Sequence, residues 1–176
     1  MIAAKPLGGL PPYGPPALSF PRPDAFSEGF VVEFASNGDE PWVGNFAKYC
    51  AESPSSVHAD LGSRAVVVVA GGAGYVVDTQ ERRLVREIGF DIRHIWFDIG
   101  IQAMVMSNGL RFEAFDAHAI LWRIRRFSWD GIRNVESSGA IVTGEAPDPM
   151  SEQWIPFRLE LSTGDVQGGS YNGPAM

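Results

Sequence analysis

Short apolar or alternating stretches recur along the chain, and Gly, Asp, Asn or Ser bounds each of them. Alternation with a period of two places every second side chain on one face of a sheet, so this pattern is typical of strands joined by tight turns. The best candidate for a helix, "GNFAKYCAES" at residues 44–53, is short and lacks a clear N-terminal cap. The pattern therefore predicts an all-β protein.

A strand–turn–strand pattern occurs four times, with Ser36, Asp78, Asp116 and Ser162 marking the turns. The markers lie 42, 38 and 46 residues apart, close to the roughly 40–45 residues of a four-stranded propeller blade. Each small sheet must stack on another to bury its second face. We therefore predict antiparallel meander sheets in about four propeller-blade-like repeats, and a β-sandwich or a partly open barrel is the alternative. Further strands are expected at residues 65–70, 92–97, 103–106 and 140–144.

The first part of the chain is rich in proline. Seven of the thirteen prolines lie before residue 24, which excludes a helix or a central strand and favours polyproline II. We therefore predict a proline-rich N-terminal leader over residues 1–24 and a single β-rich domain over residues 25–176. The leader contains "PPYGPP", which is similar to proline-aromatic docking peptides, but a surface-packed or disordered leader is the interpretation we favour.

A glycine cluster follows a run of valines in "VVVVAGGAGYVVD", residues 66–78. The phrase "GGAGYV" resembles the phosphate loop of Rossmann-type sugar epimerases, with Gly71 and Gly74 as the first two glycines. The third position holds Val77, however, and no helix pattern follows to direct its N-terminus at a pyrophosphate. The cluster therefore predicts a tight turn or a bulge, and no dinucleotide site.

Composition and charge narrow the possible partners. The chain of 176 residues is 45% hydrophobic, enough for a core, and has a net charge of −7. This charge repels nucleic acids and anionic membranes and favours basic partners. Cys50 is the only cysteine, which fits a reducing compartment. No apolar run approaches the roughly 20 residues that span a bilayer, so we expect a soluble, cytoplasmic protein that binds neither nucleic acid nor membrane.

Catalytic motifs are absent from the sequence. The three histidines lack the spacing of a metal clip, no G-x-S-x-G elbow occurs, and nothing around Cys50 indicates activation. We therefore predict no catalytic residue, no cofactor and no metal. Paired carboxylates leave a hydrolase open; the candidates are Glu113, Asp116, Asp130, Glu136 and Glu145.

The densest polar-aromatic stretch is "LWRIRRFSWDGIRN", residues 121–134. In a strand Trp122 points to one face, and "SWDG" then predicts a turn. One interpretation is a binding patch in which Trp129 offers a flat surface beside Asp130, and Arg126 and Arg133 offer forked donors to a carboxylate. The alternative, which we favour, is structural: Trp122 lies in the core, Trp129 covers the sheet end, and Asp130 pairs with an arginine. The same two interpretations apply to Trp42, Asn45 and Trp154.

Four phrases together carry a resemblance. "WVGNF", "VVAGGAGYVVD", "RFEAFDAHAILWRIRRFSWDGIRN" and "WIPFRLELSTGDVQGGSY" resemble an uncharacterised family of small soluble bacterial all-β proteins, and "FRLELSTG" is also similar to strands of propeller blades. The resemblance implies a β-rich fold and no catalytic residue.

Two functions follow from these observations. The first is a non-enzymatic binding protein, for example an acidic inhibitor or immunity-like protein of a basic partner, because charge complementarity speeds association. The second is a hydrolase that acts on a sugar or another polar substrate through paired carboxylates. Two carboxylates within a deep pocket would favour the hydrolase, and scattered carboxylates on a surface would favour the binding protein.

Overall fold

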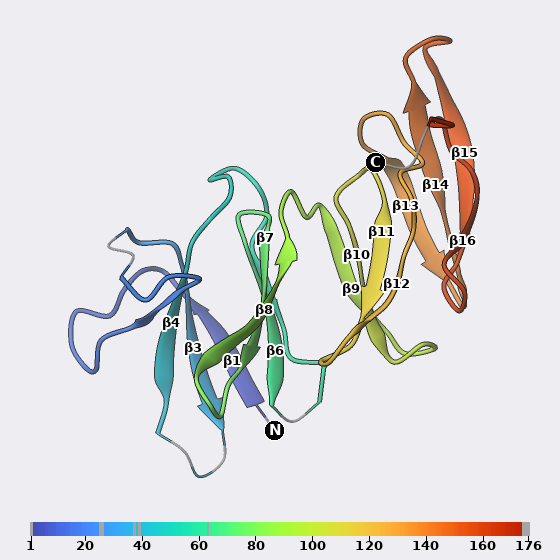
Figure 1. The fold of residues 1–176 in the computed structure, drawn as a ribbon. Coiled ribbons are helices and arrows are strands. Elements are labelled where there is room, and N and C mark those ends of the chain that lie inside the picture. The colour runs from blue at the N-terminus through green and yellow to red at the C-terminus, as the bar shows by residue number, and fades with distance from the viewer. Residues whose placement is uncertain (1, 25–26, 37, 39, 63, 174–176) are drawn as a thin grey trace. The chain divides into compact units, whose positions relative to one another are not determined.

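The structure is a computed structural model that describes residues 2–24, 27–36, 38, 40–62 and 64–173 (Figure 1). These residues form sixteen strands and no helix, so the described part of the chain contains no helix that could cross a membrane. The strands make four sheets of four strands each. The chain divides into two compact units, residues 1–92 and residues 93–176, and each unit contains two of the sheets.

The first sheet includes both strands of the proline-rich leader. Its order is β1-β3-β4-β2, with β2 parallel to β4 and the other pairs antiparallel. The leader strands β1 and β2 occupy the two edges, where the missing N–H of Pro6 removes no central ladder bond. The strands are β1 (Ile2–Leu7), β2 (Leu18–Phe20), β3 (Phe30–Ser36) and β4 (Trp42–Phe46).

The other three sheets are meanders in which each strand pairs with the next along the chain. The second sheet contains β5 (Ser56–His58), β6 (Ala65–Ala70), β7 (Ala73–Asp78) and β8 (Arg83–Gly89). The third contains β9 (His94–Asp98), β10 (Ala103–Ser107), β11 (Phe112–Phe115) and β12 (Ile120–Arg123). The fourth contains β13 (Arg133–Ser138), β14 (Ile141–Asp148), β15 (Gln153–Glu160) and β16 (Asp165–Gly168).

The predicted repeat is confirmed, because each turn marker lies at or just after the end of a strand in a different sheet. Ser36 ends β3 and Asp78 ends β7, whereas Asp116 follows β11 and Ser162 follows β15. Asp78 Oδ1 accepts hydrogen bonds from the backbone N–H groups of residues 80 and 81, at 3.0 and 2.9 Å. Asp116 Oδ1 accepts from residues 118 and 119, both at 2.7 Å. In the part of the chain described, no sheet closes into a barrel, which is consistent with the blade-like prediction.

Each unit has a hydrophobic core between its two sheets. In the first unit, the rings of Phe46 on β4 and Tyr75 on β7 lie 5.6 Å apart between their centroids. In the second unit, Phe112 on β11 and Phe157 on β15 lie 5.9 Å apart. Burial of one such side chain contributes about 1.5–3 kcal/mol, so these contacts between sheets stabilise each unit.

The glycine cluster forms the turn between β6 and β7. Gly71 and Gly72 have φ angles of +51° and +82°, which glycine adopts without steric cost. A Cβ atom on Gly71 would lie 2.2 Å from the carbonyl oxygen of Cys50. The backbone N–H of Cys50 in turn donates a hydrogen bond to the Gly71 carbonyl at 2.9 Å. A strand that starts at Ala73 follows the glycines, so the cluster is a turn at which two backbones meet.

Replacement of Gly71 tests this close approach. Gly71→Ala places a methyl group against a backbone carbonyl, and we expect it to lower the free energy of unfolding by about 2–4 kcal/mol. Gly139→Ala is the control, because Gly139 has a similar φ of +58° but an added Cβ there meets nothing within 4 Å. It should cost about 1 kcal/mol. Equal losses in urea unfolding would contradict the proposed role of the Cys50 contact.

Candidate functional site

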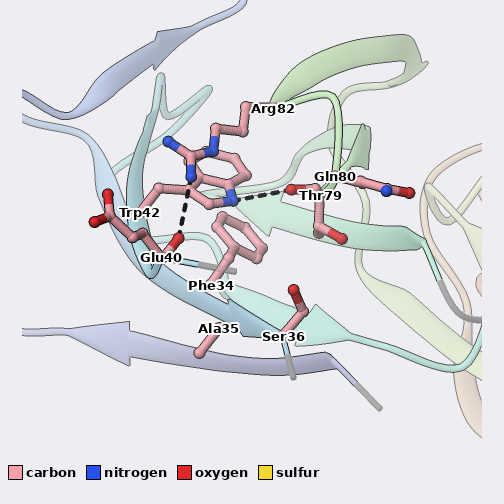
Figure 2. A pocket seen from close by; sticks show the side chains of 8 residues that line it. All are labelled: Phe34, Ala35, Ser36, Glu40, Trp42, Thr79, Gln80 and Arg82. Atoms are coloured by element: carbon pink, nitrogen blue, oxygen red, sulfur yellow. Dashed lines mark hydrogen bonds between the residues drawn. The ribbon is translucent and has the colours of Figure 1, made fainter. Parts of the chain in front are cut away.

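A small pocket beside Trp42 has a structural role. Figure 2 shows the Trp42 indole N–H donating to the Thr79 carbonyl at 3.0 Å, and Arg82 donating to the Glu40 carbonyl at 3.1 Å. The pocket encloses about 50 Å³, which is room for water and not for a metabolite. The hydrogen bond from the indole fixes the buried Trp42 side chain between the two sheets of the first unit. Trp42 thus has the structural role that was one of its two interpretations.

Asn45 also acts within the fold. Its side-chain oxygen accepts a hydrogen bond from the N–H of Gly29 at 2.7 Å, and its amide nitrogen donates to the Ser27 carbonyl at 3.1 Å. A buried amide satisfied on both sides holds the neighbouring loop in place.

A larger, open groove lies in the second unit, and we name it the Trp129–Trp154 groove. Its volume is about 540 Å³. One side is the loop between β12 and β13, and the other is the hairpin of β14 and β15. The lining residues are Trp129, Asp130, Pro147, Asp148, Pro149, Glu152, Gln153 and Trp154.

Strand register places Trp154 on the outer face of its sheet. Residues that are direct cross-strand partners share a face, and Pro147 pairs with Trp154. The alternate positions of β14, among them Val142, Gly144 and Ala146, are buried. Trp154 therefore points away from the core, and it is 37% exposed.

Arg133 supports the indole of Trp154. The Arg133 guanidinium carbon lies 3.9 Å from the ring centroid, within the range of a cation–π contact. The Nε of Arg133 donates to Glu145 Oε2 at 2.8 Å, and Glu145 is the direct cross-strand partner of Arg133. This hydrogen bond is the main cause that lowers the pKa of Glu145 below its ordinary value, so the carboxylate is ionised at neutral pH.

Phe127 positions the loop that carries Trp129. Its N–H donates to the Leu110 carbonyl at 3.1 Å, and its own carbonyl accepts from Ser170 and Tyr171 at 2.9 and 3.0 Å. The buried ring of Phe127 lies 4.8 Å from Phe157 in the core. The loop is therefore fixed by the core and by the C-terminal segment, which gives Trp129 a defined position.

The predicted "SWDG" turn is present. The Ser128 hydroxyl donates to the Gly131 carbonyl at 2.5 Å, and Gly131 has a φ of +76°. Trp129 and Asp130 at the head of the turn are exposed. The Trp129 ring meets Tyr171 edge-on at 4.7 Å.

All four predicted site residues lie at or beside the groove, but in different roles. Trp129 and Asp130 line it. Arg126 donates to the carbonyls of Ser128 and Trp129 at 2.9 and 2.5 Å, and its guanidinium lies 4.7 Å from the Tyr171 ring centroid. Arg126 and Arg133 therefore donate hydrogen bonds to groups of the protein itself, and each guanidinium also lies against one of the two tryptophan rings.

The groove itself is acidic. Asp130, Asp148 and Glu152 line it, and none of the described residues that line it is a lysine or an arginine. Asp148 accepts hydrogen bonds from the Ser151 hydroxyl at 2.6 Å and the Met150 N–H at 3.0 Å. These hydrogen bonds lower the pKa of Asp148, and the bond from Ser151 has the largest effect. The groove thus combines exposed indole rings with negative charge.

None of the other carboxylates considered for catalysis is among the residues that line the groove. Glu113 is buried and pairs with Arg123, Asp116 caps a turn, and Glu145 pairs with Arg133. Glu136 is exposed on β13. Among the residues described, no three His, Cys, Asp or Glu side chains group so that they could hold a metal ion.

Half of the groove has no evident signature in the amino-acid sequence. The turn phrase "PDPMSE" supplies Pro147, Asp148, Pro149 and Glu152, but nothing local connects it with Trp129, which lies far away along the chain. The local signal for it is the alternation along β14, in which the even-numbered residues 142, 144 and 146 are buried and the odd-numbered residues face outward.

Comparisons with known proteins add little to this geometry. No protein-family model matches the chain, and no curated protein matches it. A crystal structure of the computationally designed Ika8 protein is similar, with a TM-score of 0.45 and 14% identity over 80% of this chain and 46% of that one. A crystal structure of a eukaryotic initiation factor has a TM-score of 0.44 and 12% identity over 81% of this chain and 40% of that one. The chain therefore spans less than half the length of either structure.

The bracing role of Arg133 is testable. Arg133→Ala removes the main hydrogen bond that lowers the pKa of Glu145, so this pKa should rise toward its ordinary value. The tryptophan emission should shift to longer wavelength because Trp154 loses its cover. The pKa is measured by NMR titration of the side-chain carboxyl group. The control is Arg158→Ala, since Arg158 lies 3.8 Å from Glu160 elsewhere on the sheet. An unchanged pKa of Glu145 in Arg133→Ala would contradict the assignment.

Proposed function

We propose that this protein is a non-enzymatic binding protein that holds a basic segment of a partner protein in the Trp129–Trp154 groove. The observation that supports this proposal is the lining of the groove, which combines two exposed tryptophans with three carboxylates. None of the described lining residues is a lysine or an arginine, and Arg133 contacts Trp154 from outside this lining. Tryptophans often dominate the energy of protein interfaces, and carboxylates form charge-assisted hydrogen bonds with arginine and lysine.

The charge of the whole chain supports the same proposal. A net charge of −7 attracts a basic partner and raises the rate of association. An acidic inhibitor or immunity-like protein is a concrete version of such a binding protein. The single cysteine fits a cytoplasmic location, and the phrases described above suggest kinship with small bacterial β-rich proteins.

Hydrolysis is the second candidate, and one observation weighs against it. A glycosidase needs one carboxyl group of raised pKa beside a second carboxylate. Hydrogen bonds from Ser151 and Met150 lower the pKa of Asp148 in the groove, so Asp148 is not suited to be the proton donor of such a pair. We therefore place the binding protein first.

Removal of charge from the groove tests the proposed function. The double variant Asp130→Asn with Glu152→Gln should weaken binding of a fluorescein-labelled hexa-arginine peptide about tenfold, or about 1.4 kcal/mol. Fluorescence anisotropy at about 0.15 M salt, where distant charges are screened, measures the dissociation constant.

The matched control removes the same charge elsewhere in the second unit. Glu136→Gln with Asp165→Asn changes two exposed acidic residues that do not line the groove, and binding should change less than about twofold. Equal weakening by both double variants would show attraction by net charge alone and would reject the groove. Turnover of a glycoside that is lost in Asp130→Asn would favour the hydrolase instead.

A further inference from the structure

The groove is better suited to contact a ligand through side chains than to pair with it through the backbone groups of a strand edge. At the end of the β14–β15 hairpin, Pro147 and Pro149 have no N–H group. Pro156 on β15 has none either, and its carbonyl already accepts from Gly169 at 3.1 Å. A peptide that adds to a sheet needs a row of free backbone donors and acceptors. The prolines therefore disfavour recognition by strand addition here.

A polyproline II segment fits such a surface. It has no internal hydrogen bonds, its backbone stays solvated, and its proline rings pack on aromatic side chains. The groove supplies the indoles of Trp129 and Trp154 together with the ring of Pro147, the direct cross-strand partner of Trp154. Because polyproline II is already formed in free proline-rich chains, such a ligand loses little conformational entropy on binding.

The charges of the groove specify what must accompany the prolines. Asp130, Asp148 and Glu152 call for basic side chains in the ligand. Arginine is favoured over lysine because a guanidinium forms forked bonds with carboxylates and stacks on aromatic faces. The Arg133 guanidinium stacked on Trp154 at 3.9 Å is an example of this contact within the protein itself.

The protein's own proline-rich loop is the other occupant to consider. Tyr13 in this loop is 91% exposed, and the Glu28 carboxylate anchors the loop by accepting a hydrogen bond from the Leu10 N–H at 3.0 Å. The stretch "GGLPPYGPPA", residues 8–17, has no lysine or arginine, so it offers the three carboxylates nothing to pair with. The loop of a second copy is therefore a poorer match than an arginine-bearing segment.

We infer that the Trp129–Trp154 groove binds an arginine-bearing proline-rich segment of another protein in the polyproline II conformation. This inference rests on the proposed function, and it adds that the partner is recognised through its proline rings as well as through its charge.

Three labelled peptides separate the two claims. In the first, arginine flanks a Pro-Pro-Leu-Pro-Pro core; in the second, alanine replaces every proline; in the third, glutamate replaces both arginines. We expect the first peptide to bind at least about tenfold more tightly than either of the others, as measured by fluorescence anisotropy. Equal affinity for the first and second peptides would overturn the proline inference and leave the proposed function standing. Failure of both to bind would overturn both claims.

Variants of the protein then locate the contact. Trp154→Ala should weaken the first peptide at least about tenfold and the alanine peptide much less. Leu121→Ala is the control, because Leu121 is a similarly exposed apolar residue on β12 outside the groove, and it should change neither affinity. Equal effects of Trp154→Ala and Leu121→Ala would overturn the inference. A second copy of the chain would be the occupant instead if sedimentation showed a dimer, if Tyr13→Ala abolished that dimer, and if the peptides did not displace it. That combined result would also overturn the inference.

Discussion

Each four-stranded sheet of this protein depends on a second sheet to cover its apolar face. The requirement is clear in β6, where Val66, Val68 and Ala70 are buried in the core that the second sheet shares with the first. The aromatic contacts of Phe46 with Tyr75 and of Phe112 with Phe157 bring two sheets together within each unit. A small sheet exposed on both faces is not stable alone. The turns and surface loops of each unit therefore depend on these contacts between its two sheets.

The same core positions the candidate site. The ring of Phe127 packs against both Phe112 and Phe157, and its backbone holds the turn that presents Trp129. On the opposite side of the groove, the alternation of β14 buries Ala146 and turns Pro147 outward. The groove therefore rests on rigid elements, and rigid elements hold recognition residues more precisely than free loops.

Local chemistry explains what the sequence predicts correctly. Alternation identifies strands such as Ala65–Ala70, and carboxylates such as Asp78 and Asp116 identify turns because their oxygens accept neighbouring N–H groups. The glycine cluster is recognised as a turn because a strand pattern, and no helix pattern, follows it. All three signals lie within a few residues of the feature that they specify.

Pairing between distant segments explains what the sequence leaves open. The parallel pairing of β2 with β4 and the division of the chain after Ile92 have no local signature. The placement of Trp129 and Trp154 on one groove depends in the same way on tertiary packing. The sequence also does not show that Arg126 and Arg133 contact groups of the protein itself. Their partners, Tyr171 for Arg126 and Glu145 for Arg133, are brought to them by the fold.

The most direct test of the fold is a nuclear Overhauser spectrum of the labelled protein. We predict cross-peaks between the rings of Phe46 and Tyr75 and between those of Phe112 and Phe157, because each pair joins two sheets across a core. We also predict cross-strand backbone contacts between Val68 and Tyr75, which are partners on either side of the glycine turn. The absence of these ring contacts, or a run of sequential amide contacts typical of a helix over residues 73–85, would contradict a protein built from paired sheets.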